Sequence, residues 1–448
     1  MPSHTKETPR VEDELHKIIS GRVEKSSKET NDANKTPREK QDRKPVVRKY
    51  AMLLAYQGKN YFGMQIQKDQ STIEGMIFNA LEKCGFITEE QKNDPYSFYF
   101  QRAARTDKAV SAVRQTCSMF LPRDLNVNID GHLKMNDNLP PDIRILGFRV
   151  ATRNFHCQKD CSSRTYSYTV PSYTFAPLDE LTKGDYRISE ERIKEVNDVL
   201  SIYKGTHNFF NYTSRRDSGD KSCFRFIIDF YAGKPFIYKD SLHEKEHEFI
   251  TIFIHGQSFM LHQIRKMIGM SIAVLRGHTF KSEIQRSFEP IRMDVPKAPG
   301  LGLVLEKVHY TNYDKKWGKS HPTLDDWGEE VEKSIESVKI DLVYKEILDT
   351  ECYKFNMMQW LADISKHSFS ENPTSEEGVN RELTGVQMAN SLLKNIQQET
   401  EAKTVESNVQ VKEETSLKEE ISGKEEIPVK EEILNKDEMS VKVETNAH

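Results

Sequence analysis

An isolated acid stands among basic side chains in the segment QRAARTDKAVSAVR, residues 101–114. The acid is Asp107, and the cations are Arg102, Arg105, Lys108 and Arg114. Strand-like sequence precedes the segment at 96–100 and follows it at 116–121, so we expect a loop that carries a carboxylate in a basic field. Such a field favours the ionised carboxylate and attracts phosphate groups. For a segment of this kind taken alone, a solvated ion-pair loop is the more frequent explanation.

A second segment offers groups that suit a nucleic-acid base. Alternation along the strand-like sequence RTYSY places Arg164, Tyr166 and Tyr168 on one face. A tyrosine beside an arginine supplies a stacking surface and a phosphate partner, which together can hold a base out of its stack. Ordinary half-buried tyrosines of a strand are the more frequent reason for this pattern.

A third segment, GQSFMLHQIRKM at residues 256–267, carries His262, Arg265 and Lys266 near a helix whose other face is apolar. An arginine in this position can project into a cleft and pair with a carboxylate through two hydrogen bonds. A surface arginine is the default explanation.

Metal and cofactor sites find little support in the sequence. His156, Cys157 and Cys161 provide two or three potential zinc ligands, but no second pair stands at a zinc-site spacing. The sequence contains no Walker loop, no dinucleotide glycine fingerprint and no nucleophile elbow. We therefore expect neither a metal nor a cofactor.

The elements that must position these groups are mostly short strands. Segments rich in β-branched or aromatic residues stand at 50–56, 116–121, 143–150, 165–170, 226–230, 249–254 and 302–308. A few helices interrupt them without strict alternation. This pattern indicates an α+β body with a largely antiparallel sheet.

Three helices of the body have recognisable ends. One follows Ser71, which forms a capping-box pattern with Glu74. A second opens at Ser189, and its apolar stripe runs to Gly205, the expected C′ glycine. A third covers about 258–276 and stops at Gly277. Acidic helices with aromatic anchors are expected at 324–338, 342–348 and 353–364, and they should pack on the body.

The chain has 448 residues, a hydrophobic share of 36% and a formal net charge of -4. That share is low for a chain that is folded throughout. We expect a disordered arm at 1–47, a body at 48–312 whose two halves meet near 171–188, a helical extension at 313–367 and a disordered, acidic Lys-Glu-rich tail at 368–448. The body is moderately basic and the sequence after it is acidic, which is compatible with a polyanionic partner.

The cysteine content and the absence of recognisable targeting signals bear on the cellular compartment. Six cysteines are too sparse for a disulfide framework and favour a reducing environment. The N-terminus shows no secretory signal and no good mitochondrial presequence, and the longest apolar run, 267–275, is too short to span a bilayer. We expect a soluble intracellular protein without membrane contact. The basic stretch 35–49 fits a nuclear import signal and a solvated arm about equally well.

Six collinear motifs resemble one family closely. They are YQGKNYFGMQIQ (56–67), RTDKAVSA (105–112), RTYSYTVP (164–171), GTHNFFNYTS (205–214), GQSFMLHQIRKMIGM (256–270) and APGLGLVLEKV (298–308). In order and spacing they resemble the TruA-type pseudouridine synthases, over about residues 48–367. The Gly63-Met64-Gln65 triplet and the ending Gln359-Trp360-Leu361 are similar to the eukaryotic tRNA pseudouridine synthase 1 branch.

The resemblance implies two α/β halves whose antiparallel sheets join into one around a basic central cleft. It implies an enzyme that breaks the C1′–N1 bond of a uridine, rotates the uracil and rejoins it through C5, without cofactor or metal. The implied partner is tRNA, with messenger and small nuclear RNA left open as further substrates. A monomer is favoured, and the nucleus is the expected location, with the mitochondrion left open.

The resemblance also implies the site. Asp107 is the catalytic aspartate, which abstracts the 2′ proton or attacks the sugar or the base. Arg265 pairs with it, Tyr166 stacks on or hydrogen-bonds the flipped uridine, and Leu303 is an apolar wall of the uracil pocket, with Arg105 also on the substrate. The RNA backbone is expected to contact Arg102, Lys108, Arg114, Arg164, His262 and Lys266.

One position departs from the family pattern. Glycine is usual where this chain has Ala109, and an alanine held at positive φ costs on the order of 1 kcal/mol. We therefore expect either an ordinary negative φ at Ala109 or a shifted loop. A second class of function also stays open, namely a tRNA-binding or RNA-folding chaperone that uses the same cleft without turnover.

Overall fold

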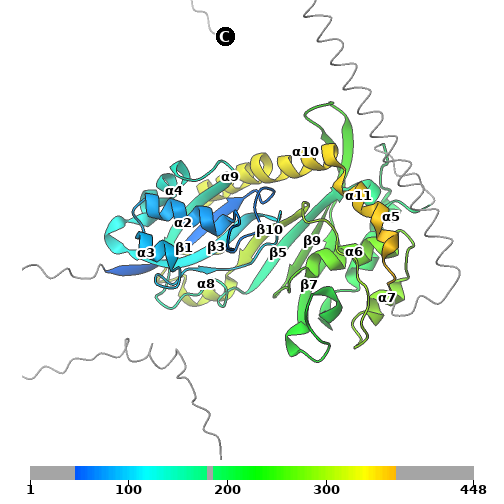
Figure 1. Ribbon diagram of the computed structural model, residues 1–448, viewed down its shortest axis with the longest axis horizontal. Coiled ribbons are helices and arrows are strands. Elements are labelled where there is room, and N and C mark those ends of the chain that lie inside the picture. Colours follow the sequence, from blue (N-terminus) through cyan, green and yellow to red (C-terminus); the bar gives the residue numbers. More distant parts are fainter. Residues whose placement is uncertain (1–45, 179–184, 370–448) are drawn as a thin grey trace, which may run out of the picture. The chain divides into compact units, whose positions relative to one another are not determined.

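The computed structural model describes residues 46–178 and 185–369 (Figure 1). The predicted arm (1–47) and tail (368–448) lie almost entirely outside the described residues, as does most of the basic stretch 35–49. Among the described helices, none has both the length and the apolar character needed to cross a bilayer.

A single sheet forms the centre of the described chain. Its strands run in the order β4-β1-β3-β10-β5-β9-β7-β6, with β2 added to β3 and β8 added to β9. The bounds are β1 (Val47–Tyr56), β2 (Gln101–Arg102), β3 (Ser111–Pro122), β4 (Ile143–Val150), β5 (Ser163–Pro171), β6 (Gly205–Asn208), β7 (Phe224–Ala232), β8 (Phe236–Lys239), β9 (Glu246–Gly256) and β10 (Leu303–His309).

The pairing divides this sheet into two halves. Neighbouring strands are antiparallel throughout, except for β3 and β10, which pair parallel at Val304–Ser111 and Leu305–Ala112. Two antiparallel sheets are thus joined by one parallel pair, which confirms the predicted α+β fold. The boundary expected near 171–188 stays a prediction, and in the sheet β5 lies on the second side of the parallel pair.

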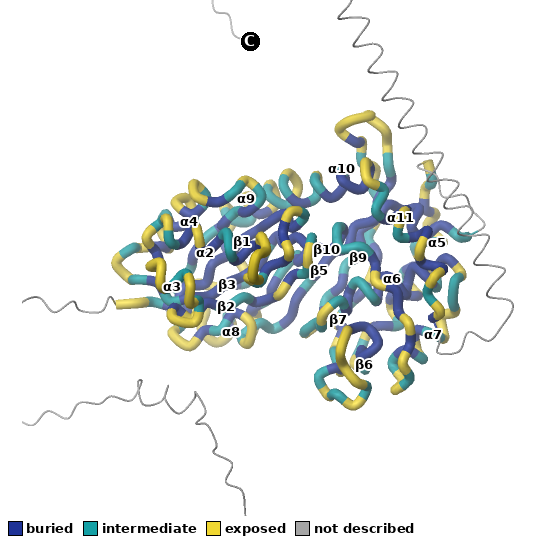
Figure 2. The backbone as a smooth tube through the Cα atoms, in the orientation of Figure 1, coloured by how far each residue is buried: buried dark blue, intermediate teal, exposed yellow. Residues whose placement is uncertain are grey.

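The core follows the strands. From Tyr50 to Tyr56 every residue of β1 is buried, because this strand is covered on both faces. Figure 2 shows the central strands as a dark blue band, with exposed residues at the loops.

Seven helices and several 3₁₀ turns accompany the described part of the body and its junction with the extension. The α-helices are α2 (Ile73–Lys83), α3 (Glu89–Asn93), α4 (Val127–Asp137), α5 (Glu190–Ser201), α6 (Gln263–Leu275), α7 (Lys281–Arg286) and α8 (Thr311–Trp317). The 3₁₀ turns are Arg123–Leu125, Ser172–Phe175, Phe210–Tyr212, Lys221–Cys223 and, at the end of the extension, Ile364–Lys366. In Figure 1, α2, α3 and α4 lie beside the first half and α5, α6 and α7 beside the second.

Several predicted ends are corrected by the structure. Thr72, not Ser71, caps α2 and accepts a hydrogen bond from the Gly75 amide, while Glu74 is fully buried and binds Arg102 instead of closing a capping box. Residues 96–100 form turns rather than a strand, because Pro95 starts a chain reversal in which Phe98 and Phe100 pack on Phe78. β2 then shortens the predicted loop.

Two further helix ends differ from the prediction, and two agree with it. Ser189 caps α5 as expected, but the helix ends at Ser201, and Gly205, with φ 99°, instead begins β6. Helix α6 begins at Gln263, so Leu261 lies in the preceding loop and is 54% exposed. Gly277, with φ 80°, ends it as predicted.

The extension is helical, as expected, with different bounds. It contains α9 (Glu329–Val338), the π-helical segment Lys339–Tyr344, α10 (Lys345–Lys354) and α11 (Asn356–Asp363), and α8 was not predicted. Trp327 is buried against Gly147 of β4, which has no side chain to block it. Tyr344 donates to Glu306 of β10 at 2.7 Å.

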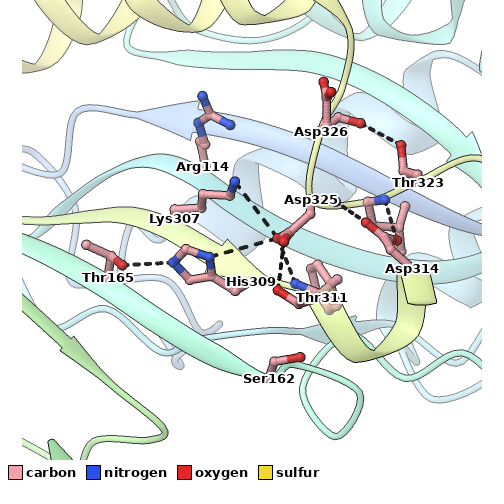
Figure 3. Close-up of polar contacts among 12 residues, drawn as sticks. Arg114, Ser162, Thr165, Lys307, His309, Thr311, Asp314, Thr323, Asp325 and Asp326 are labelled. Atoms are coloured by element: carbon pink, nitrogen blue, oxygen red, sulfur yellow. Dashed lines mark hydrogen bonds and ion pairs between the residues drawn. The ribbon is translucent and has the colours of Figure 1, made fainter. Parts of the chain in front are cut away.

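Asp325 is the hub that fastens the start of the extension to the sheet (Figure 3). Its carboxylate accepts hydrogen bonds from the Tyr310 amide at 2.8 Å and the Thr311 hydroxyl at 2.9 Å. Lys307 and His309 of β10 each approach it at 3.9 Å, and His309 also contacts Thr165 of β5. The extension is therefore held on β10, which is one strand of the parallel pair that joins the two halves, and through His309 it is connected to β5.

Candidate active site

A cavity of about 520 Å³ lies where the predicted site residues meet. Its walls come from the loop 103–110, from β5, β7 and β10, and from the loop and first turn of α6. Both halves of the sheet therefore contribute to one cavity. Of the residues predicted from the sequence, it contains Arg105, Asp107, Arg164, Tyr166, His262, Arg265 and Leu303.

Asp107 faces two nitrogen groups of the second half. Its Oδ2 lies 3.9 Å from Nη1 of Arg265 and 3.7 Å from Nε2 of His262. Burial lowers the pKa of His262 below its usual value, and the negative charge of Asp107 only partly opposes this. At neutral pH the permanent cation beside the carboxylate is thus Arg265, as expected from the sequence.

The loop that carries Asp107 is held by the segment after β1. The Thr106 hydroxyl hydrogen-bonds the Tyr56 hydroxyl at 2.8 Å, and the Thr106 carbonyl accepts from the Met64 amide at 3.1 Å. Gly63, at φ 96°, lies so close that a Cβ would stand 2.7 Å from the Thr106 carbonyl oxygen. The first of the six motifs therefore acts as a support for the second.

Ala109 adopts the conformation that the sequence argued against. Its φ is 64°, in the left-handed region, and its amide donates to the Tyr61 carbonyl at 3.2 Å. The first alternative, a negative φ at Ala109, is therefore wrong, and the second, a shifted loop, stays a prediction. Contacts with the 57–64 segment hold the backbone in this conformation, although it is unfavourable for an alanine.

An aromatic and aliphatic wall faces the acid. Tyr166 is 7% exposed, and its ring meets Phe259 edge to face, with centroids 5.3 Å apart. Burial raises the pKa of Tyr166 to about 12, so its hydroxyl stays protonated. Among the described residues, none forms a hydrogen bond with that hydroxyl. Leu303, also buried, lines the same cavity from β10.

The arginine of α6 is oriented by the loop before β10. Nε of Arg265 donates to the Ala298 carbonyl at 2.7 Å, and the Ala298 amide donates back to the Arg265 carbonyl. Gly300 stands beside the guanidinium and beside the Lys108 carbonyl, where a Cβ would be within 3.2 Å. This loop thus holds both Arg265 and the Asp107 loop.

Of the residues predicted to contact the RNA backbone or the substrate, some line the cavity and others do not. Arg105 is exposed at the cavity, and Lys108 is exposed with its Nζ 4.2 Å from the centre of the Phe62 ring. Arg164 lines the cavity, but its guanidinium donates to the carbonyls of Ala103, Gln158 and Gln257.

Three others are not brought to the cavity. Arg102 pairs with the buried Glu74, Arg114 pairs with Glu332 of the extension, and Lys266 donates to the Asn211 carbonyl at 2.8 Å. A role of these side chains in binding RNA stays a prediction, but each already has an intramolecular partner.

Sequence reasoning missed Phe259, Gln158 and Arg225, which also line the cavity. Phe259 lies inside the fifth motif (256–270), three residues before His262, so the sequence offered a signal for it. Arg225 lies in a strand segment with no distinctive neighbours, and only the pairing of β7 with β9 brings it to the cavity. Among residues 46–178 and 185–369, no cluster of three His, Cys, Asp or Glu side chains is arranged to hold a metal.

The cavity therefore brings together a carboxylate beside an arginine, a tyrosine hydroxyl and an apolar wall. Comparison with known proteins identifies the family. A family model described as tRNA pseudouridine synthase matches residues 199–311, which include Arg265 and Leu303 but not Asp107 or Tyr166.

Relatives of similar length match most of the chain. The Pseudouridylate synthase 1 homolog of Mus musculus is 41% identical over 340 residues, covering 74% of this chain and 77% of the relative. The Homo sapiens homolog is 41% identical and covers 73% and 75%. The tRNA pseudouridine synthase 1 of Yarrowia lipolytica is 30% identical and covers 75% and 78%. The chain belongs to the TruA-type tRNA pseudouridine synthase family and is an isomerase.

Proposed function

We propose that this chain converts specific uridines of tRNA to pseudouridine, with Asp107 as the catalytic residue and the target base flipped into the cavity. The relatives named as tRNA pseudouridine synthases support tRNA as the substrate. The observation that carries the assignment of the site is the position of Asp107 in one cavity with Arg265, Tyr166 and Leu303.

The geometry fits each step that the reaction needs. A base that leaves its stack loses favourable contacts, and an aromatic side chain recovers part of them. Tyr166 and Leu303 offer such surfaces, and the Tyr166 hydroxyl is free to hydrogen-bond the ring. The cavity of about 520 Å³ is larger than a uracil ring.

Asp107 supplies the reacting group. Arg265 lies 3.9 Å from its carboxylate and can orient it to abstract the 2′ proton or to attack the sugar or the base. The C1′–N1 bond then breaks, the uracil rotates within the cavity, and C5 bonds to C1′. The C5 proton leaves to solvent, N1 takes up a proton, and Asp107 returns the proton or releases the bond that it had gained. The product is therefore an isomer of the substrate, and no oxidant or reductant is needed.

The alternative is a chaperone that binds tRNA through the same cavity without turnover. The two functions predict different pseudouridine contents of cellular tRNA. Pseudouridines should be mapped across total RNA from cells with and without the protein. Loss of modification at defined tRNA positions supports the isomerase, and it would also reveal messenger or small nuclear RNA targets. An unchanged map, with tRNA binding intact, would favour the chaperone. Nuclear residence is part of the same proposal, and imaging of the full chain tests it.

A further inference from the structure

Four arginines line the cavity, and the guanidinium groups of two of them are already bound to other groups of the protein. Arg164 directs its guanidinium at three backbone carbonyls, with distances of 2.7, 3.2 and 3.5 Å. Arg265 donates to the Ala298 carbonyl and lies beside Asp107. The other two arginines could bind a ligand. They are Arg105, which is exposed in the loop of the first half, and Arg225, in β7 of the second half.

Within residues 46–178 and 185–369, no carboxylate forms an ion pair with Arg225. Among these residues its Nη1 donates to the carbonyl of the preceding residue, Phe224, at 3.1 Å, and its Nε is buried without a hydrogen-bond partner. Asp220, the acid whose charge reaches it, is engaged by Arg216 at 2.7 Å. Burial lowers the pKa of Arg225 below its usual value.

Such an arrangement is unfavourable in the free protein. A partly buried charge with an unsatisfied donor costs free energy unless a ligand completes it. The missing group must be an acceptor, and a guanidinium pairs best with a planar or tetrahedral oxyanion through two parallel hydrogen bonds. RNA brings one phosphate per nucleotide, so a nucleotide whose base enters the cavity carries phosphates to its mouth.

We propose that Arg225 binds a backbone phosphate next to the flipped uridine and so anchors the RNA strand from the second half. The inference rests on the proposed function, because it takes RNA as the occupant of the cavity. Arg225 is a binding residue in this account, and the chemistry stays with Asp107. A contact with a uracil carbonyl instead of a phosphate would be a different role, and the test separates the two.

The first measurement compares Arg225→Gln with a matched control, Arg153→Gln. Arg153 is exposed and outside the cavity. With a tRNA transcript whose modified uridine has been mapped, Arg225→Gln should weaken binding roughly 10-fold and lower the salt slope of log K by about one unit. The control should change neither. Binding within about two-fold of wild type, or a melting temperature that falls with the affinity, would overturn the proposal, because the latter shows a structural role.

The second measurement identifies the phosphate. Neutral methylphosphonates are placed singly at the phosphates on each side of the target uridine and at one distant position. If Arg225 contacts one of them, that substitution should weaken the wild-type protein about as much as Arg225→Gln does and should have little further effect on the variant. Additive effects at both flanking positions would overturn the phosphate contact.

Both measurements are read from binding, but the positions of the methylphosphonates depend on a mapped uridine. If the protein binds tRNA and modifies no uridine, the proposed function is refuted. The affinities and salt slopes of Arg225→Gln and Arg153→Gln on unmapped tRNA then still support or overturn the Arg225 contact.

Discussion

Replacing Ala109 with glycine tests how the catalytic loop is held. Ala109 stands two residues after Asp107 and has a φ of 64°, which an L side chain tolerates poorly. Removing the Cβ relieves this strain while the hydrogen bond from the Ala109 amide to the Tyr61 carbonyl can remain. The backbone of the Asp107 loop should therefore stay in place as its cost falls.

Three contributions set the size of the effect. Relief of the left-handed conformation is worth about 1–2 kcal/mol. The greater freedom of glycine in the unfolded chain costs about 0.4–1 kcal/mol, and loss of a half-buried methyl group costs about 0.4 kcal/mol. The net free energy of unfolding should rise by about 0–1 kcal/mol.

Ala112→Gly provides the matched control. Ala112 is fully buried in β3 and is not among the positive-φ residues, so it has no such strain to release. It should lose about 1–2 kcal/mol. Thermal melts of both variants beside wild type give the comparison, and turnover on tRNA should change little in Ala109→Gly. A loss of stability in Ala109→Gly equal to that of the control would refute the account of the loop.

Three further variants follow from the same structure. Gly63→Ala should lower turnover more than 10-fold and reduce the melting temperature, because its Cβ would stand 2.7 Å from the Thr106 carbonyl oxygen at a φ of 96°; wild-type turnover would contradict it. Tyr166→Phe should slow turnover while tRNA affinity is kept, whereas Tyr166→Ala should lose both; equal, negligible effects would remove this residue from the site. Burial raises the pKa of Glu351 to about 7, so the folded state holds the proton between the usual carboxyl pKa and pH 7, and stability should fall as pH rises through this window. Glu351→Gln should therefore gain about 1–3 kcal/mol over wild type at pH 8 and little at pH 5, and melts with equal gains at both pH values would argue against a titrating carboxyl.

Seven predicted strand segments overlap β1, β3, β4, β5, β7, β9 and β10, because they rest on local patterns, whereas the short strands β2, β6 and β8 were not predicted. β4 begins at Ile143 and ends at Val150, as its β-branched and aromatic residues predict. Asp107, Tyr166, Arg265 and Leu303 were expected together from collinear motifs, and they do line one cavity. Ser189 and Gly277 mark helix ends through side-chain capping and positive φ, which are also local.

What failed depends on contacts between distant segments. Glu74 fits a capping box in the sequence, but Arg102, which is 28 residues away, draws it into a buried ion pair. Ala109 is held at positive φ by the segment after β1, which no local preference of alanine indicates. Arg114 reads as a cation of the RNA cleft, but Glu332 lies far along the chain and neutralises it. No local sequence pattern indicated that Arg225 lines the cavity, because its position depends on the pairing of β7 with β9.

The most direct test of the central claim is isomerisation by Asp107→Asn beside its tRNA affinity. The substitution keeps the size of the side chain and removes its charge, and the contacts with Arg265 and His262 are long, at 3.9 and 3.7 Å, so folding should be preserved. Tritium at uridine C5 is released when C5 bonds to C1′, and this release is measured on a transcript together with a binding titration and a melt. We predict no release, with an affinity equal to or tighter than wild type because one negative charge leaves a site that faces phosphates. Residual release above roughly one per cent of wild type, given an intact fold, would contradict the assignment of Asp107 as the catalytic residue; for an exposed ion pair alone, removal would cost only about 0–1 kcal/mol of stability.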